Sequence, residues 1–428
     1  MNPDTVRWAV GEVRGTLREE GARALAGRAA RVLRKRLAAQ PEAGFGPIVG
    51  RAGAWRGSVV VIAERLVSPQ WHDRAEQIAS ACRALDVSCV VACTDDPWSV
   101  LSAMQTAAVV FVCRVPPNDL LARVVTEAQR LRVPLVYDVA SPVFRVDRAI
   151  TGPASVVGAG ATAGWRLWEP PQPPATSVSA VRHRGALRIC RNATTATAEL
   201  AAEVARIVPG EVSVLPNGVD DDMRRIATGI DAARAAGLIA REGGRTVIGY
   251  GAGGRVDDRQ ADLDLAVIEP ALVALLTAHE HLDVRLVSSA YVPRALQAFG
   301  DRVQCAVAES LGDHLWELAQ CDVLVAPLQY GVPVGQRGTW GTLDAGVLGM
   351  PVVTSPTGVE VAVDEGVTGL VAVTTEDWVQ AVESLLADPV RRSAMGKAAV
   401  SWAARHESDG PAASALIDIL DALRVSVV

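Results

Sequence analysis

Valine-rich apolar runs alternate with helical segments along most of the chain, and this alternation constrains the fold more than any other feature. The first series of runs covers residues 58–66, 88–96, 107–115 and 134–141. Because these runs are apolar throughout rather than alternately polar, they predict strands that are buried on both faces, as in a parallel sheet covered by helices.

A second series of runs begins near residue 246 and predicts a second sheet. Its predicted strands cover residues 247–251, 283–289, 303–307, 322–328 and 351–355. A chain of 428 residues is too long for one ordinary core, so the sequence predicts an α/β fold with two doubly wound, Rossmann-like domains that face a cleft.

We expect five segments along the chain. They are an N-terminal basic helix and linker (1–57), a first domain (58–215), an interdomain linker (216–244), a second domain (245–405) and a C-terminal helix that crosses back (406–428).

The distribution of charge narrows the range of partners. The net charge of −6 argues against a nucleic-acid-binding protein. Residues 1–40 nevertheless hold nine basic and four acidic residues, with apolar residues at helical spacing. Two interpretations stay open for this segment. It is a helix on an anionic membrane surface, or it packs on its own domain or against a second subunit as a homodimer contact.

Several features predict a cytoplasmic protein, peripheral to the inner face of the membrane if the basic helix binds there. No uncharged apolar stretch reaches the roughly 18 residues of a membrane span, and the start of the chain is too charged for a signal peptide. The seven cysteines fall mostly in apolar runs and are expected to be reduced core thiols. The histidines are not clustered, so no metal site is expected.

Three features follow predicted strands of the second domain. The turn at residues 250–255 is rich in glycine, which lets a backbone approach a phosphate closely, and Arg255 and Arg259 follow it. The loop at 328–341, which contains Tyr330 and Gly338, leads into a helix whose N-terminus can bind an anion.

Asp344 is the third feature and lies about one turn into that helix. Its carboxylate can accept two hydrogen bonds from a ribose diol. It is also a favourable charge near a helix start, and the residues alone leave these two roles equal.

The chain resembles a GT-B glycosyltransferase of family-4 type, in the branch that builds bacterial surface glycans and related natural products. The resemblance runs from about residue 58 to 405. It is carried by SPQWHDR (68–74), FVCRV (111–115), VYD (136–138), TAEL (197–200), LPNGVD (215–220), GMPVV (349–353) and GVTGLV (366–371).

The resemblance implies a donor site on the second domain. Two family glutamates, separated by seven residues, fall on Gln336, near the sugar and phosphates, and on Asp344, which holds the ribose. Gly253, Gly254, Arg255 and Arg337 remain as the phosphate clamp, and Val307 lies in the stretch that borders the base. The donor-binding and catalytic positions further include Arg259, Tyr330, Gly338 and His72.

On the acceptor side, the resemblance implies roles for Arg74, Arg114 and Asp138. It also implies retention of configuration and catalysis without a metal or another cofactor, with a UDP- or GDP-sugar as co-substrate. Because the uncharged Gln336 and the shorter Asp344 stand where the family has two glutamates, two interpretations compete. The chain is an active nucleotide-sugar-dependent hexosyltransferase acting on a glycan, a lipid-linked acceptor or a small natural product, or it is a lapsed homologue that serves as a partner or scaffold protein.

Overall fold

The computed structural model describes residues 57–63, 72–144, 175–239, 244–251, 258–287, 292–328, 340–356, 363–406 and 408–425, with only the backbone at the ends of some helices. The N-terminal basic segment and the loops that hold Gly253, Gly254, Arg255, Tyr330, Gln336, Arg337 and Gly338 lie outside these residues.

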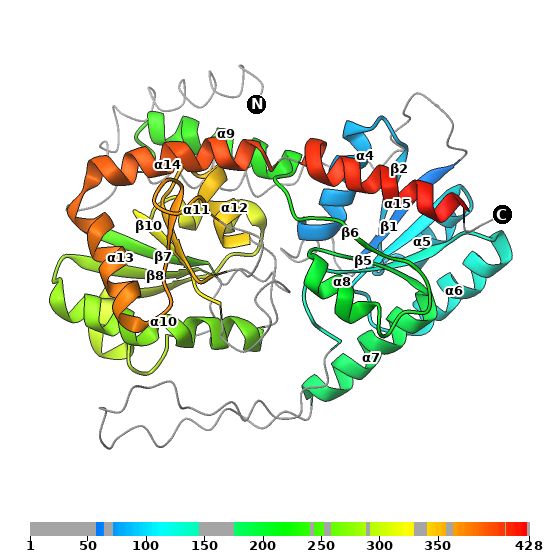
Figure 1. Cartoon of the computed structure of the whole chain (residues 1–428), viewed down its shortest axis with the longest axis horizontal. Helices are drawn as coiled ribbons and strands as arrows, with labels where there is room; N and C mark the ends of the chain where they lie inside the picture. The colour runs from blue at the N-terminus through cyan, green and yellow to red at the C-terminus, as the bar shows by residue number, and fades with distance from the viewer. Residues whose placement is uncertain are drawn as a thin grey trace, which may run out of the picture.

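Two parallel sheets, each with six strands in the described residues, confirm the predicted two-domain α/β fold (Figure 1). The first sheet has the order β2-β1-β3-β4-β5-β6. Its strands are β1 (Ser58–Ala63), β2 (Cys89–Cys93), β3 (Ala107–Cys113), β4 (Leu135–Val139), β5 (Asn192–Thr195) and β6 (Val212–Val214). Its helices are η1 (His72–Glu76), α4 (Gln77–Ala84), α5 (Pro97–Met104), α6 (Asp119–Leu131), α7 (Ala175–Cys190) and α8 (Ala198–Val204).

The second sheet has the order β12-β11-β10-β7-β8-β9. Its strands are β7 (Thr246–Gly251), β8 (Leu282–Val287), β9 (Val303–Ala306), β10 (Val323–Ala326), β11 (Val352–Thr354) and β12 (Gly369–Val371). Its helices are α9 (Asp221–Ala235), α10 (Asp258–Ala278), η2 (Gln297–Arg302), α11 (Leu311–Leu318), α12 (Trp340–Val347), α13 (Thr375–Ala387) and α14 (Pro389–Ala404).

The strand orders locate the ligand edge of each sheet. In the second sheet the order reverses between β7 and β10, and in the first between β1 and β3. Ligands of open α/β sheets bind beyond the carboxyl ends of the strands at such switch points. The segments that follow β7 and β10 are the glycine-rich turn and the loop before α12 that the sequence singles out.

Aspartates start several of the helices. The Asp96 carboxylate accepts a hydrogen bond from the Ser99 amide at the start of α5, and the Asp220 carboxylate accepts one from the Met223 amide at the start of α9. Each bond satisfies an amide that the first helical turn leaves without an intrahelical partner.

The expected linker at 216–244 contains the helix α9. The apolar residues Met223, Ile226 and Ile230 of α9 belong to a core cluster of the second domain, together with residues of α11 and α12. Of the expected linker, the short stretch before Asp221 is therefore the part that connects the first core to the second.

The end of the chain returns to the first domain. After α14, η4 (Ser408–Ala412) and α15 (Ala413–Val425) lie over the first sheet, as Figure 1 shows. Leu416, Ile419, Leu420 and Leu423 are buried in the same core cluster as β1 and α4.

Cys305 departs from the prediction that all seven cysteines are core thiols, because it is exposed whereas the other six are buried. It lies on β9, the strand at one edge of the second sheet. An edge strand leaves part of its surface in contact with solvent.

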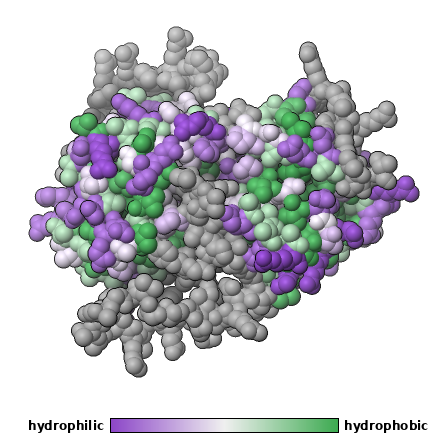
Figure 2. Space-filling view, viewed as in Figure 1, coloured by the Kyte–Doolittle hydropathy of each residue, from purple (hydrophilic) through white to green (hydrophobic). Residues whose placement is uncertain are grey.

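The described surface mixes polar and apolar residues over both domains on the face shown in Figure 2. Within the described part of the chain, no helix combines the length and the apolar character that a membrane crossing requires.

Candidate active site

The start of α12 lies against the carboxyl end of β10, beside the switch point of the second sheet. A Cβ atom at Gly341 would come within 2.7 Å of the Cβ of Ala326, the last residue of β10. The absence of a side chain at Gly341 therefore lets the first turn of α12 approach the strand closely. Asp344 follows about one turn later.

Asp344 is buried and bonded to a histidine that the sequence analysis did not single out. Its Oδ2 atom lies 3.1 Å from Nε2 of His314 on α11, and the two side chains are 2% and 1% exposed. The predicted ribose-binding carboxylate is thus held in one orientation by a neighbouring helix.

The position of His314 follows from the pattern of α11. Leu311, Leu315 and Leu318 form the buried side of this helix, and His314 lies on the same side at helical spacing. Ser310 caps the helix by accepting a hydrogen bond from the Asp313 amide. A polar residue on the apolar side of a short helix was the sequence signal for this site.

Gly251, the last residue of β7, lies directly against the imidazole of His314. A Cβ atom at this position would be 3.0 Å from Cε1 and 3.3 Å from Nε2 of the ring. The end of β7, α11 and α12 therefore converge on the His314–Asp344 pair, at the point where the glycine-rich turn leaves the sheet.

Arg74 and Asp138, which the sequence analysis predicted on the acceptor side, meet in the interior of the first domain. Nε and Nη2 of Arg74 donate to the two carboxylate oxygens of Asp138 at 2.8 and 2.7 Å. The side chains are 2% and 0% exposed. The Thr194 hydroxyl also donates to Asp138 at 2.7 Å, so the carboxylate is strongly hydrogen bonded.

Arg74 extends this cluster to the interdomain connection. Its Nη1 donates to the Leu215 carbonyl and to Oδ1 of Asn217, both at 2.9 Å. The pair thereby joins the end of β4 to the Pro-Asn-Gly stretch.

Arg114 lies beside this cluster at the end of β3, next to the switch point of the first sheet. Its amide donates to the Asp138 carbonyl at 3.2 Å, and its φ angle of 54° is in the left-handed region. A non-glycine residue rarely adopts this conformation, which costs roughly 1–2 kcal/mol. The backbone turn at the end of β3 is therefore held in a specific geometry.

A second histidine is buried in the first domain near this edge. Nδ1 of His183 on α7 lies 2.7 Å from the Tyr137 hydroxyl, which also donates to the Val115 carbonyl. Burial, and then the positive charge of Arg114, lower the pKa of His183 to about 4. A neutral imidazole therefore lies beside Tyr137 at physiological pH.

Two other predicted site residues are described by their backbone alone. His72 lies in η1 and Arg259 in α10, with their side chains outside the described residues. Val307 follows β9 and is 71% exposed. Within the described residues, no three His, Cys, Asp or Glu side chains gather in a way that could hold a metal ion.

Two Rossmann-like domains whose ligand edges carry these residues define the GT-B architecture. The comparisons with known proteins agree with this class. Residues 254–388, which include α11 and α12, match the family model described as Glycosyl transferases group 1. No curated protein matches the chain.

Solved structures share the fold. HepE from Anabaena in complex with UDP and glucose has a TM-score of 0.52 at 13% identity, over 85% of this chain and 99% of that chain. The same protein with UDP-glucose has a TM-score of 0.52 at 12% identity, over 86% and 100%. A glycosyltransferase from Rickettsia africae has a TM-score of 0.51 at 9% identity, over 86% and 98%.

The domain match and the GT-B fold are consistent with the prediction that the chain is a nucleotide-sugar-dependent glycosyltransferase.

Proposed function

We propose that the chain is a family-4-type glycosyltransferase that moves a sugar from a nucleotide diphosphate sugar to an acceptor with retention of configuration. The observation that carries this proposal is the buried carboxylate of Asp344, one turn into α12 at the switch point of the second sheet. The glycosyltransferase domain match covers this helix.

In this proposal, the donor lies on the second domain. Asp344 accepts hydrogen bonds from the ribose hydroxyls. The backbone around Gly253 and Gly254, with Arg255 or Arg337, takes the pyrophosphate, and Gln336 lies near the sugar. Stabilisation of the departing diphosphate and positioning of the sugar account for most of the catalysis, without a metal.

UDP is the first nucleotide to test and GDP the second. The two HepE structures are complexes with UDP and glucose and with UDP-glucose, which supports a UDP-sugar here. The exposed Val307, after β9, borders the base in this proposal.

The acceptor enters from the first domain, near Arg114 and His72, with Arg74 and Asp138 supporting that edge from within. A glycan, a lipid-linked acceptor and a small natural product all fit this proposal. The basic N-terminal segment would bring the protein to the inner face of a membrane or to a second copy. Stronger retention of the full chain than of a 41–428 truncation on anionic liposomes supports the membrane role, and equal retention contradicts it.

The test is nucleotide binding by the parent chain and by Asp344→Asn. The panel is UDP, GDP, ADP, CDP and dTDP, measured by thermal shift and then by calorimetry. A nucleotide at 100 times its Kd stabilises the folded state by about 2.7 kcal/mol. Hydrogen bonds to a charged group contribute about 1.5–3 kcal/mol, so Asp344→Asn should bind the preferred nucleotide roughly 10- to 100-fold more weakly.

Asp231→Asn, which changes an exposed carboxylate on α9, is the matched control and should bind like the parent. Equal binding by Asp344→Asn and the parent would refute the ribose assignment. No shift of the parent with any nucleotide would instead favour a lapsed homologue that acts as a partner or scaffold protein.

A further inference from the structure

The His314–Asp344 pair is more than a buried contact between two helices, because the hydrogen-bond donor in it can be assigned. A carboxylate only accepts hydrogen bonds, so Nε2 of His314 is the donor in the 3.1 Å contact with Oδ2 of Asp344. Nδ1 of the same ring is buried and has no hydrogen-bond partner among the described residues. The contact with Asp344 is therefore the side-chain hydrogen bond that orients this imidazole.

The surroundings fix the imidazole as firmly as its hydrogen bond does. Gly251 lies against one part of the ring, where an added Cβ atom would be 3.0 Å from Cε1 and would make a tight contact. Leu315 and Leu318 on the same helix are fully buried. The imidazole thus has little freedom to rotate away from Asp344.

We propose that His314 is a positioning residue for nucleotide recognition. By donating from Nε2, it fixes the plane of the Asp344 carboxylate, so that the ribose diol meets an acceptor that is already oriented. This inference rests on the proposed ribose role of Asp344. It adds a residue from α11, a helix that supplies none of the other proposed donor contacts.

Orienting the Asp344 carboxylate before the nucleotide binds should have a measurable effect on affinity. Immobilising a side chain on binding costs about 0.5–1.5 kcal/mol, and a carboxylate held in advance does not incur this cost. Loss of the His314 hydrogen bond should therefore weaken binding of a ribonucleotide about three- to tenfold. The loss should act through the ribose hydroxyls and should leave the base and the phosphates unaffected.

A purely structural role makes a different prediction. If His314 only holds α11 against α12, its removal lowers the stability and weakens all nucleotides alike. The ratio of affinities for a ribonucleotide and its deoxy analogue would then stay unchanged. This ratio is therefore the readout that separates the two roles.

The experiment compares His314→Gln with His314→Met in the full chain. Gln has an amide nitrogen at about the reach of Nε2 and can still donate to Asp344, whereas Met has a similar length and no donor. Calorimetry gives the Kd of each protein for UDP, 2′-deoxy-UDP and 3′-deoxy-UDP. If the panel selects another nucleotide, that nucleotide and its deoxy analogues take the place of UDP.

We expect the parent and His314→Gln to prefer the ribonucleotide to a similar degree. We expect His314→Met to bind it three- to tenfold more weakly and to lose most of the preference over the deoxy analogue. Adding His314→Met to Asp344→Asn should cost no further affinity, because His314 acts through Asp344. If His314→Met does not fold, His314→Asn, whose amide is too short to reach, takes its place.

An unchanged ratio in His314→Met would overturn this inference and leave the proposed function intact, because the parent still binds the nucleotide. An additive loss in the double variant would also overturn it. A parent that binds no nucleotide would overturn both the proposed function and the inference.

Discussion

Arg74 and Asp138, separated by 64 positions in the sequence, form a two-point salt bridge with both side chains almost completely buried. A planar guanidinium matches the two oxygens of a carboxylate, so this geometry uses arginine in a way that lysine could not reproduce. Because Arg74 also bonds to Leu215 and Asn217, the pair ties the first sheet to the chain that leaves it.

Removal of Arg74 should destabilise the first domain severely. Arg74→Ala leaves the Asp138 carboxylate buried without its cation, which typically costs 3–5 kcal/mol. The measurement is the midpoint of thermal or urea unfolding. Arg130→Ala, which removes an exposed pair with Glu127, is the control and should change the midpoint little. Similar midpoints for the two variants would contradict the structural role of Arg74.

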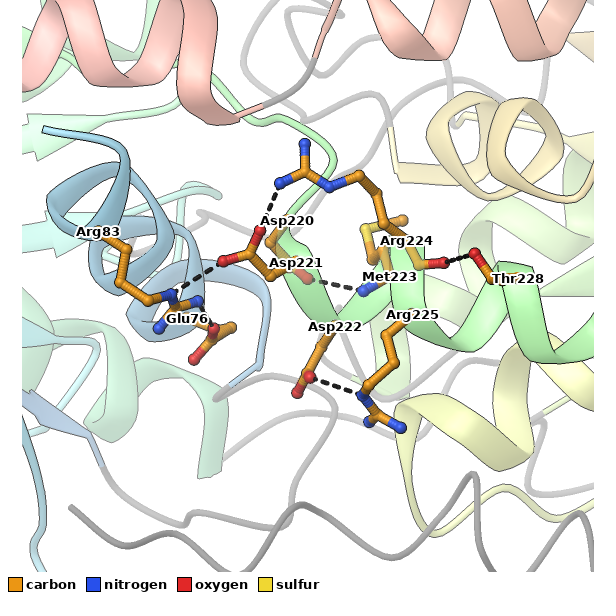
Figure 3. A network of polar contacts seen from close by, with 9 residues as sticks. All are labelled: Glu76, Arg83, Asp220, Asp221, Asp222, Met223, Arg224, Arg225 and Thr228. Carbon is orange, nitrogen blue, oxygen red and sulfur yellow. Dashed lines mark hydrogen bonds and ion pairs between the residues drawn. The ribbon is translucent and has the colours of Figure 1, made fainter. Parts of the chain in front are cut away.

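A second ionic cluster joins the domains more loosely, as Figure 3 shows. Arg83 on α4 donates from Nε to Oδ2 of Asp221 at 2.9 Å, at the start of α9. Arg83 also bonds to Glu76, and Arg224 bonds to Asp221. These side chains are partly exposed, apart from the more buried Glu76, so the cluster is open to screening by salt.

The Asp221 contribution to stability should depend on pH. Burial raises the pKa of Asp221, but the hydrogen bonds from Arg224 and Arg83 outweigh it and lower the pKa. A carboxyl with a lowered pKa stabilises the fold above its unfolded pKa of about 3.9, and the stabilisation is lost as the pH falls further. Asp221→Asn should therefore be less stable than the parent by at most about 1 kcal/mol at neutral pH.

Urea unfolding from pH 7 to pH 3 checks this expectation. The difference between the parent and Asp221→Asn should shrink in the acidic part of the series and also in high salt. Asp231→Asn supplies the control on the same helix. A difference that is constant with pH would rule out the ionic origin of the effect.

His183 should make the first domain less stable as the pH falls through the histidine range. Its folded pKa of about 4 lies below the unfolded value of about 6.5, so only the unfolded chain takes up the proton between these values. Stability is then complete above about pH 6.5 and falls by up to about 1.4 kcal/mol per pH unit toward pH 4.

His183→Gln cannot titrate and should lack this part of the pH dependence in unfolding experiments. His279→Gln, which changes a half-exposed histidine of the second domain, should keep the pH dependence of the parent. Equal slopes for the parent and His183→Gln would contradict the buried neutral state of His183.

Close packing between α14 and the end of α12 depends on Gly396 of α14. A Cβ atom there would overlap the carbonyl oxygen of Gly349, which follows α12. Because backbone atoms cannot move aside as a flexible side chain can, Gly396→Ala should cost about 1–3 kcal/mol or more. Gly410→Ala, where an added Cβ meets nothing within 4 Å, should leave the unfolding midpoint unchanged. A parent-like Gly396→Ala would refute the close approach.

Sequence reasoning predicted the two-sheet architecture because long apolar strands carry a strong signal. It did not identify the strand β5, whose four residues Asn192–Thr195 are mostly polar and are buried through hydrogen-bonded threonines. It also treated α9 as part of a linker, because the apolar side of that helix is buried by α11 and α12, which come later in the sequence.

Prediction of the site was partial for a similar reason. Asp344 was predicted from its place after a glycine-rich loop and from family resemblance. His314 and Asp344 lie 30 positions apart, and nothing in the linear pattern joins them. Arg74 and Asp138, expected on the acceptor side, lie 64 positions apart, and only the folded chain shows that they form a buried pair.

The return of α15 to the first domain has a consequence for how the protein is made. Leu416, Ile419 and Leu420 complete a core that β1 and α4 begin near the other end of the chain. During synthesis the ribosome must produce the whole second domain before these residues emerge. Part of the apolar surface of the first domain therefore stays uncovered until α15 has been translated, and the core of the domain encoded first is completed only after the second domain has been made.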